Sequence, residues 1–447
     1  MLSLDEAQDR AEMLVAAARR AGADACDAVY GCDASSSVSV RLGALEDVER
    51  SESEHVSLRV FVGRRSASIS SSDMAQATLA GLVDRAVAMA REAPEDAYAG
   101  LAPEQRLLRD ALPQLDIADD ADPEPVKLRE RALEAEDAAR NVAGVTNSEG
   151  AGAGHGRSQM ALVTSHGFAG AYAGTSHSTW ASVLAGSGGA MQRDYASHNV
   201  RWLDDLDAPG AIGTQAGDRA VARLNPRRLE SGPIPIIFDP RVGSSLVGHL
   251  IGAIVGPAIT RRSSFLLDRL GGRIFPEAIS IYDDPRRPRG LRSRPFDGEG
   301  LPTAPRTLID GGVLTGWLLD SASARQLGLE PTGHAMRGGG SPGASATNVH
   351  LAPGDASPAD LMRDIKRGLY VTELIGQGVN GVTGDYSRGA AGFLIEDGGL
   401  TVPVSEITIA GNLKDMFANL VAASDLAFRY SVNTPTLRVD GMTLAGA

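Results

Sequence analysis

The segments Leu369–Ile375 (LYVTELI) and Ser405–Ile409 (SEITI) carry the pattern that decides the fold of the C-terminal half of the chain. Both are short, rich in β-branched and apolar residues, and typical of strands. Pro235–Phe238 (PIIF) is a further strand candidate, and glycines recur between such segments. Closely spaced strands with glycine turns predict a barrel-like or strongly curved sheet in this Gly-rich, strand-rich part.

Ahead of this region, helical and strand patterns alternate. Apolar residues recur at helical spacing over residues 4–21, where Ser3 and Glu6 form a capping-box pattern. Two alternating stretches then predict strands, and a second helix is expected at about residues 74–91. Residues 157–194 read as four glycine-separated strands between two further helices. These patterns predict an α+β fold.

The composition divides the chain into four regions. Asp116–Glu124 is acidic with one large apolar residue, which favours a solvated connection. The expected regions are an N-terminal α+β domain (1–93), an acidic Pro/Ala-rich connection (94–125), a central α+β segment (126–226) and a C-terminal β-rich domain (227–447).

Charge and cysteine content exclude several classes of function. The 447 residues carry a net charge of -13, so a basic surface that follows phosphates is not expected, and nucleic acid is not a predicted direct ligand. Two cysteines and an acidic N-terminus without a signal-peptide pattern predict a reducing cytoplasm. Residues 242–259 lack charged side chains but include a proline and several glycines, so we expect a buried helix there and no membrane association.

The chain lacks the usual hydrolase motifs. None of its eight histidines precedes a glutamate, so no HExxH pattern occurs, and no GxSxG elbow is present. A metal site assembled from dispersed histidines stays open as an alternative. His249 is expected to be a core histidine in an apolar helix, beside the stripe formed by Gly248, Gly252 and Gly256, along which another backbone could approach closely.

A glycine-rich stretch near the C-terminus is the strongest candidate for binding. Residues 376–381 match GxGxxG, but no helix pattern follows to bind a phosphate, so a nucleotide site is not predicted. The density of glycines around Asp385, Tyr386, Ser387 and Arg388 instead indicates a loop where a bound peptide could approach the backbone.

Several long motifs resemble the TldD/PmbA family. The general family motifs are Phe265–Asp268, Arg294–Gly300, Leu318–Arg325 and Thr332–Ala335; those similar to the PmbA (TldE) branch are Thr372–Val379, Thr383–Phe393 and Pro403–Met416. The similarity extends more loosely over the N-terminal half.

The resemblance implies one subunit of a heterodimeric zinc metalloprotease. In such a pair the TldD subunit supplies a His-Glu-x-x-x-His helix and a C-terminal cysteine, and the pair cleaves unfolded or small peptides in leader-peptide removal and antitoxin turnover. The matching helix here has Gly248, His249 and Ala253 at the three motif positions, and residues 419–447 lack cysteine. We therefore expect no catalytic residue, metal ligand or cofactor in this chain, with zinc in the TldD partner.

This chain is then expected to line the peptide chamber, with Asp385, Tyr386, Ser387 and Arg388 as the peptide-binding hypothesis, acting in a loop or by strand addition. The expected partner is a TldD-type subunit, or a second copy of this chain in its absence. Two alternatives stay open. One is a self-sufficient metallopeptidase with dispersed ligands, and the other is a non-enzymatic binding protein of the type described as a modulator of DNA gyrase.

Overall fold

The first half of the chain folds into one long antiparallel sheet in the computed structural model, which describes residues 1–446. Its six strands follow the order β3-β2-β1-β4-β5-β6. β1 pairs with β4 from Asp27 opposite Thr164 to Val40 opposite Ala151, so regions 1–93 and 126–226 share this sheet. The strands are β1 (Ala25–Arg41), β2 (Ala44–Val62), β3 (Arg65–Ser71), β4 (Val145–Thr164), β5 (Ala169–Ala185) and β6 (Gln192–Val200).

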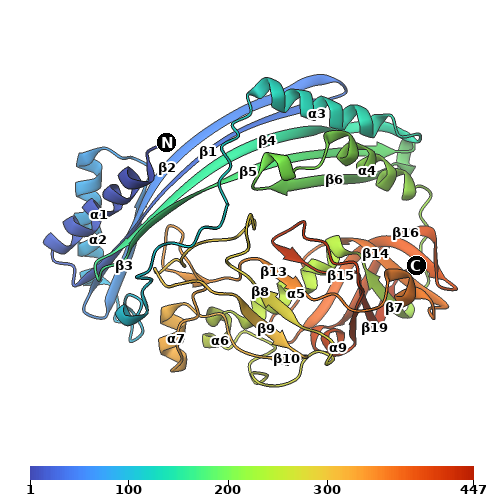
Figure 1. The fold of residues 1–447 in the computed structure, drawn as a ribbon. Coiled ribbons are helices and arrows are strands. Elements are labelled where there is room, and N and C mark those ends of the chain that lie inside the picture. Colours follow the sequence, from blue (N-terminus) through green and yellow to red (C-terminus); the bar gives the residue numbers. More distant parts are fainter. Residues whose placement is uncertain (447) are drawn as a thin grey trace.

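Four helices cover the outer face of the long sheet. Helices α1 (Leu4–Arg20) and α2 (Gln76–Glu92) pack at one end, and α3 (Pro125–Arg140) and α4 (Pro209–Ala222) at the other (Figure 1). The predicted capping box of Ser3 and Glu6 begins α1. Between α3 and α4, a Cβ on Gly213 would lie 2.0 Å from the Ala135 carbonyl oxygen, so only glycine permits this close helix packing.

The glycines of residues 157–194 do not separate four strands, as the sequence suggested. Gly167 separates β4 from β5, and Gly186, Gly188 and Gly189 separate β5 from β6. Gly170 and Gly174 instead lie inside β5, where a Cβ would approach Phe296 and Arg201 at 3.0 Å. A glycine ahead of this segment also makes room within a strand: in β4, a Cβ on Gly152 would lie 2.5 Å from the Trp180 indole nitrogen. Cross-strand packing, which the sequence does not display, therefore decided the strand lengths.

The connection over residues 94–125 is only partly solvated: Asp116, Asp120, Asp122 and Glu124 are exposed as expected, whereas Ile117 and Asp119 are buried. Apart from a single 3-10 turn at Glu104–Arg106 it has no regular structure, yet Ile117 is buried against the sheet. The Ile117 carbonyl accepts a hydrogen bond from the Thr175 N–H, and the Leu203 N–H donates to the Asp119 carboxylate. Hydrogen bonds to the sheet thus hold an acidic segment that composition alone would leave in water.

The C-terminal half contains the predicted barrel. Its strands pair in the order β7-β14-β15-β16, and β19 pairs with β7. The pairing of β16 with β19 then closes the barrel. The predicted fold class is therefore confirmed. The barrel strands are β7 (Gly232–Phe238), β14 (Arg367–Ile375), β15 (Asp385–Glu396), β16 (Gly399–Asn412) and β19 (Leu437–Ala445), and β17 (Leu420–Ala422) pairs at its edge.

Shorter elements surround the barrel. A small sheet has the order β10-β9-β8-β13-β18. The elements are α5 (Pro240–Ile254), α6 (Gly256–Thr260), β8 (Ile281–Asp283), β9 (Arg306–Asp310), β10 (Val313–Leu314), α7 (Ser321–Leu327), β11 (Ala335–Met336), β12 (Gly343–Ala344), β13 (Val349–Leu351), α8 (Pro358–Met362), α9 (Leu413–Ala418) and β18 (Val432–Asn433). Among the described residues, no helix combines the length and apolar character needed to cross a bilayer.

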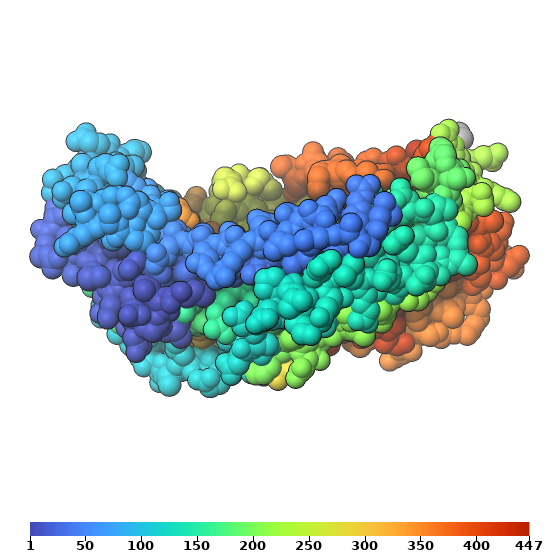
Figure 2. Space-filling view, turned by 90° about the horizontal axis from the view of Figure 1, so that it is seen from above, coloured from blue at the N-terminus to red at the C-terminus, as the bar shows by residue number. Residues whose placement is uncertain are grey.

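The long sheet arches over the C-terminal half, as Figure 1 shows, and the view from above in Figure 2 shows the N-terminal half lying across the C-terminal half. At one end of the sheet, half of β2 lacks a second neighbour. β3 pairs only with Val56–Val62, so Ala44–His55 is hydrogen-bonded to β1 alone within the described chain. The apolar side chains of Leu45 and Val48 are exposed there.

A buried ionic cluster joins the long sheet to the C-terminal half. Asp27 of β1 lies between Arg59 of β2 and Arg337, which follows β11, and bonds to both guanidinium groups. Glu299 lies 4.0 Å from Arg59. Burial alone would raise the pKa of Asp27, but the charges of Arg337 and Arg59 outweigh it and keep that pKa below its usual value. The cluster therefore holds a charged carboxylate in the interface.

We expect Arg337→Met to destabilise the protein by about 3–5 kcal/mol, because it removes one of the two cations that compensate the buried charge of Asp27. The measurement is the free energy of unfolding in urea. Arg50→Met is the matched control, since Arg50 pairs with Glu52 at an exposed site and should matter little. Equal stability of the two variants would contradict this role for the cluster.

Candidate functional site

Helix α5 supplies one side of the candidate site. Asp239 caps it by accepting a hydrogen bond of 3.0 Å from the Arg241 N–H, and Pro240 occupies the first turn. Leu246, Leu250 and Ile254 are buried in the core around the barrel. The helix is therefore anchored by one apolar stripe, which leaves other positions, including His249, to face β15.

Strand β15 supplies the opposite side, and its alternation separates the four residues proposed for peptide binding. Tyr386 is buried and Arg388 is half-buried, whereas Asp385 and Ser387 are exposed. Successive side chains of a strand point to opposite faces. Only Tyr386 and Arg388 are therefore brought together with α5, so the predicted loop at this position is in fact part of a strand.

His249, Tyr386 and Arg388 form a group with unused hydrogen-bonding capacity. The rings of His249 and Tyr386 lie edge to face, with centroids 6.1 Å apart. Within the described chain, His249 Nε2, the Tyr386 hydroxyl and Arg388 Nε have no hydrogen-bond partner. Buried polar atoms without partners are uncommon and costly, so the group is suited to bind a ligand.

The electrostatics of this group favour a neutral imidazole beside a cation. Burial lowers the pKa of His249, and the positive charge of Arg388 lowers it further. Burial also raises the pKa of Tyr386 to about 12, against the opposing effect of Arg388. The tyrosine hydroxyl therefore remains a donor at neutral pH, and Arg388 provides the positive charge.

Arg388 opens onto a crevice of about 320 Å³ between the long sheet and the barrel. We call this cavity the α5 crevice. Its lining residues are Arg193, Asp194, Tyr195, Arg223, Arg241, Val242, Ser245, Thr372, Glu373, Leu374 and Arg388. The size is at the lower end of the range for small-ligand sites.

An ionic network fixes the walls of the α5 crevice. Asp194 of β6 pairs with Arg241 of α5 at 2.8 Å and with Arg223 at 3.4 Å, and Arg223 also bonds to Glu373 of β14. Burial alone would raise the pKa of Asp194, but hydrogen bonds and charge from Arg241 keep it low. Arg241 of α5 and Arg223, which follows α4, are thus neutralised, in contrast to Arg388.

Asp385 has a structural task outside the α5 crevice. Its carboxylate accepts hydrogen bonds from the Thr383 hydroxyl and from the Asn412 amide, which in turn caps α9. Ser387 donates its backbone N–H to the Gly378 carbonyl. The segment 376–381 therefore folds back against β15, and β15, not a helix, follows it.

The three positions aligned with a zinc motif offer a single donor side chain between them. Gly248 and Ala253 have no donor side chain, Gly248 is exposed and Ala253 is buried in the core. His249 is the one imidazole at these positions, and the Arg388 cation repels a second cation there. These residues do not fit zinc, whose sites in proteins need three or four donors. Across residues 1–446 no cluster of three or more His, Cys, Asp or Glu side chains could hold a metal.

Of the glycines predicted to form a stripe, Gly248 and Gly252 lie in α5 but Gly256 begins α6, because the helix expected over residues 242–259 is interrupted at Val255. Of the three, Gly256 alone lies close to another segment. A Cβ on Gly256 would lie 2.4 Å from the Ser323 Cβ, but beside Gly248 and Gly252 the space is open.

Four residues of the α5 crevice had no signal in the sequence: Asp194, Arg223, Arg241 and Glu373. They come from four different elements far apart in the chain, and their charges looked like those of ordinary surface residues.

Comparison with known proteins gives the family. Models of the PmbA/TldA metallopeptidase domains match residues 27–90 (domain 1), 118–224 (central domain) and 231–446 (C-terminal domain). The chain is also 41% identical to metalloprotease PmbA of Escherichia coli O157:H7, over 92% of this chain and 90% of that protein. This chain belongs to the PmbA/TldD family.

Further proteins are similar in sequence or in fold. The metalloprotease PmbA homolog of Haemophilus influenzae is 36% identical over 99% of this chain and 96% of its own. A crystal structure from Bacteroides thetaiotaomicron, described as a putative modulator of DNA gyrase, superimposes with a TM-score of 0.92 at 27% identity and 100% coverage of both chains. TldE from Thermococcus kodakarensis, at 22% identity, shares the fold with a TM-score of 0.86, over 97% of this chain and 99% of its own.

We expect Arg388→Gln to raise the pKa of His249, because it removes a positive charge that disfavours the imidazolium form. Burial remains, so the pKa should still lie below its usual value. NMR titration of the imidazole signals measures this, with His249→Gln assigning the resonance. Arg367→Gln, at an exposed position of β14, is the control and should leave the His249 titration unchanged. An unchanged titration in Arg388→Gln would show that the two side chains do not interact.

Proposed function

We propose that this chain is the zinc-free, peptide-holding subunit of a two-subunit metalloprotease that cleaves unfolded or small peptides. A TldD-type partner would supply the zinc and the general base, and this chain would line the chamber. The observation that carries the proposal is the group of His249, Tyr386 and Arg388, which has unpaired donors at the position of the family's metal helix and contains no metal-binding set.

The chemistry of this group suits a peptide acceptor. Peptide carbonyls and the terminal carboxylate accept hydrogen bonds, and hydrogen bonds from a charged donor such as Arg388 are the strongest available. Val242 and Leu374 add apolar surface beside Arg388 in the α5 crevice. A peptide held here would therefore be bound by side chains. Strand addition to β15 is not available: β16 pairs along one edge, and the other edge is occupied by β14 from Gly389 onward and by residues 378–379 before it.

The two alternative functions predict different zinc contents and different peptide cleavage. A self-sufficient metallopeptidase would retain about one zinc per chain and cleave peptides alone, and a gyrase-type modulator would bind its target without any cleavage in the presence of the partner. Zinc content and peptidase activity should be measured for the purified chain alone and mixed with a TldD-type subunit from the same cell. Cleavage only on mixing, with zinc only in the partner, is the expected result; stoichiometric zinc and activity in this chain alone would refute the proposal.

The cellular location and the binding partners of the protein are predictions from the sequence. We propose a cytoplasmic protein, a heterodimer with the TldD-type subunit or a homodimer when that subunit is absent, and no direct contact with nucleic acid or membrane. Both cysteines, Cys26 and Cys32, are free and buried.

In the mixed enzyme, Arg388→Ala is expected to raise KM for a short peptide by about tenfold or more, because one charge-assisted hydrogen bond contributes about 1.5–3 kcal/mol. Initial rates over a range of peptide concentrations measure this. Ser387→Ala, on the opposite face of the same strand, is the matched control and should leave KM unchanged. Equal kinetics for the two variants would remove Arg388 from peptide binding.

A further inference from the structure

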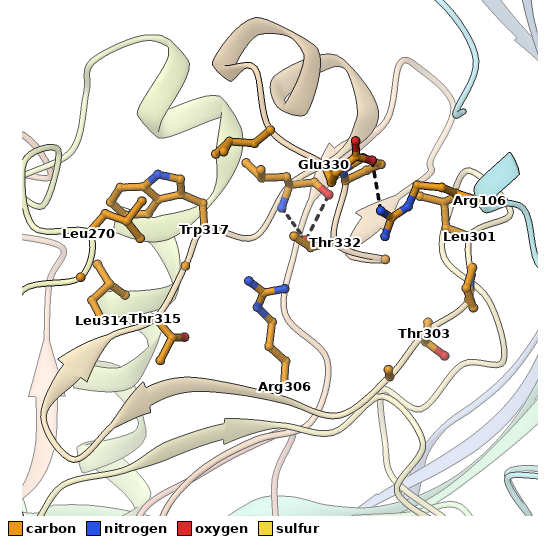
Figure 3. A pocket seen from close by; sticks show the side chains of 18 of the residues that line it. Arg106, Leu270, Leu301, Thr303, Arg306, Leu314, Thr315, Trp317, Glu330 and Thr332 are labelled. Carbon is orange, nitrogen blue, oxygen red and sulfur yellow. Dashed lines mark hydrogen bonds and ion pairs between the residues drawn. The ribbon is translucent and has the colours of Figure 1, made fainter. Parts of the chain in front are cut away.

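A second cavity, separate from the α5 crevice, lies between the β9–β10 hairpin and the segments on either side of α7 (Figure 3). We call it the β9 cavity. Its volume is about 680 Å³, well within the range of small-ligand sites. Leu301, Leu314, Trp317 and Leu319 among its lining residues are buried core side chains. The β9 cavity shares no lining residue with the α5 crevice.

The walls of the β9 cavity are largely apolar, with exposed leucines at two points. Leu270 and Leu329 are each 46% exposed, although large apolar side chains are usually covered. Figure 3 shows Leu270 near Trp317 on one side of the cavity, with Leu314 beneath them. These residues offer a hydrophobic surface to the body of a ligand.

Arg306 of β9 is the polar group that points into this space (Figure 3). Within the described chain its guanidinium makes no hydrogen bond to another residue and no ion pair. By contrast, Arg106 at the far side pairs with Glu330 at 3.1 Å. The hydroxyl groups of Thr303, Thr315 and Thr332 are also occupied, since each donates to a backbone carbonyl.

The charges around the β9 cavity favour an anion. Its described lining contains Arg106, Arg286 and Arg306 against a single carboxylate, Glu330, which leaves an excess of two positive charges in a chain whose net charge is -13. Burial lowers the pKa of Arg306, but arginine remains protonated at any ordinary pH. A half-buried guanidinium without a counter-charge is stabilised when a ligand carboxylate reaches it.

We propose that the β9 cavity binds an apolar carboxylate, whose anionic head bonds to Arg306 and whose hydrocarbon body packs against Trp317, Leu270 and Leu314. The planar guanidinium matches a carboxylate through two parallel hydrogen bonds. Free carboxylic acids and the C-termini of apolar peptides present this same chemistry. The site does not depend on the proposed protease function, because it uses none of the residues of the α5 crevice.

The test compares acids with their neutral amides on the full-length chain. The probes are 4-phenylbutanoate and 4-phenylbutanamide, and N-acetyl-leucyl-leucine and its C-terminal amide. Isothermal titration calorimetry measures binding, and tryptophan fluorescence reports on Trp317, with Trp317→Phe identifying its signal. Binding of an acid at least about tenfold tighter than its amide supports the proposal, and the acid that binds identifies the source of the ligand.

The variant arm uses Arg306→Gln, which removes the charge but retains a long polar side chain. We expect it to weaken acid binding by about tenfold or more and to leave amide binding unchanged. Arg269→Gln removes an exposed charge near Leu270 outside the cavity lining and should bind the acids like the unmodified chain.

Equal binding of acids and amides, undiminished acid binding by Arg306→Gln, or no binding of either acid at about 10 mM would overturn the proposal. The comparison of acids with amides needs no variant, so it decides the question even if Arg306→Gln fails to fold.

Discussion

The placement of Asp27 between Arg59 and Arg337 is the interaction on which the rest of the structure depends. It is a carboxylate buried in the interface between the long sheet and the C-terminal half, and it stays charged only because both arginines approach it. A buried pair of this kind tolerates little displacement, since each charge is costly without its partner. It therefore fixes how the sheet lies over the barrel at one place along the arch.

A second set of ion pairs fixes that relation beside the α5 crevice. Asp194 comes from the edge strand of the long sheet, and Arg241 begins α5 below it. The α5 crevice lies between the long sheet and the barrel, and the ion pairs of Asp27 and of Asp194 fix the distance between these two layers. Its shape therefore depends on both sets of ion pairs. Arg388 faces this space without a counter-ion, which sets it apart from its neighbours Arg223 and Arg241. The protein neutralises the charges that build the crevice and leaves free the one that could meet a ligand.

Local patterns in the sequence predicted local structure well. The capping box at Ser3 and Glu6 began a helix as expected, and closely spaced apolar strands with glycine turns predicted the barrel. Glycine was ambiguous by contrast, because the same residue that ends a strand at a turn also makes room for a ring within one, as Gly152 does for Trp180. Pairing of β1 with β4 joins residues more than a hundred positions apart, and no local pattern encodes it. The same holds for the candidate site. His249 and the 385–388 segment could be identified from the sequence, but strand alternation brings only Tyr386 and Arg388 of that segment to α5. The ionic network around Asp194 could be identified only from the tertiary structure.

The half-paired strand β2 has a consequence for the behaviour of the protein at high concentration. An open strand edge can template the growth of fibrils, and exposed Leu45 and Val48 would favour such growth. The same stretch, Ala44–His55, contains Glu46, Asp47, Glu49, Glu52 and Glu54 against the single arginine Arg50. If two copies aligned these edges, rows of carboxylates would face each other at the spacing of adjacent strands, where like charges repel most strongly. The acidity of this edge thus opposes edge-to-edge association of this long hairpin.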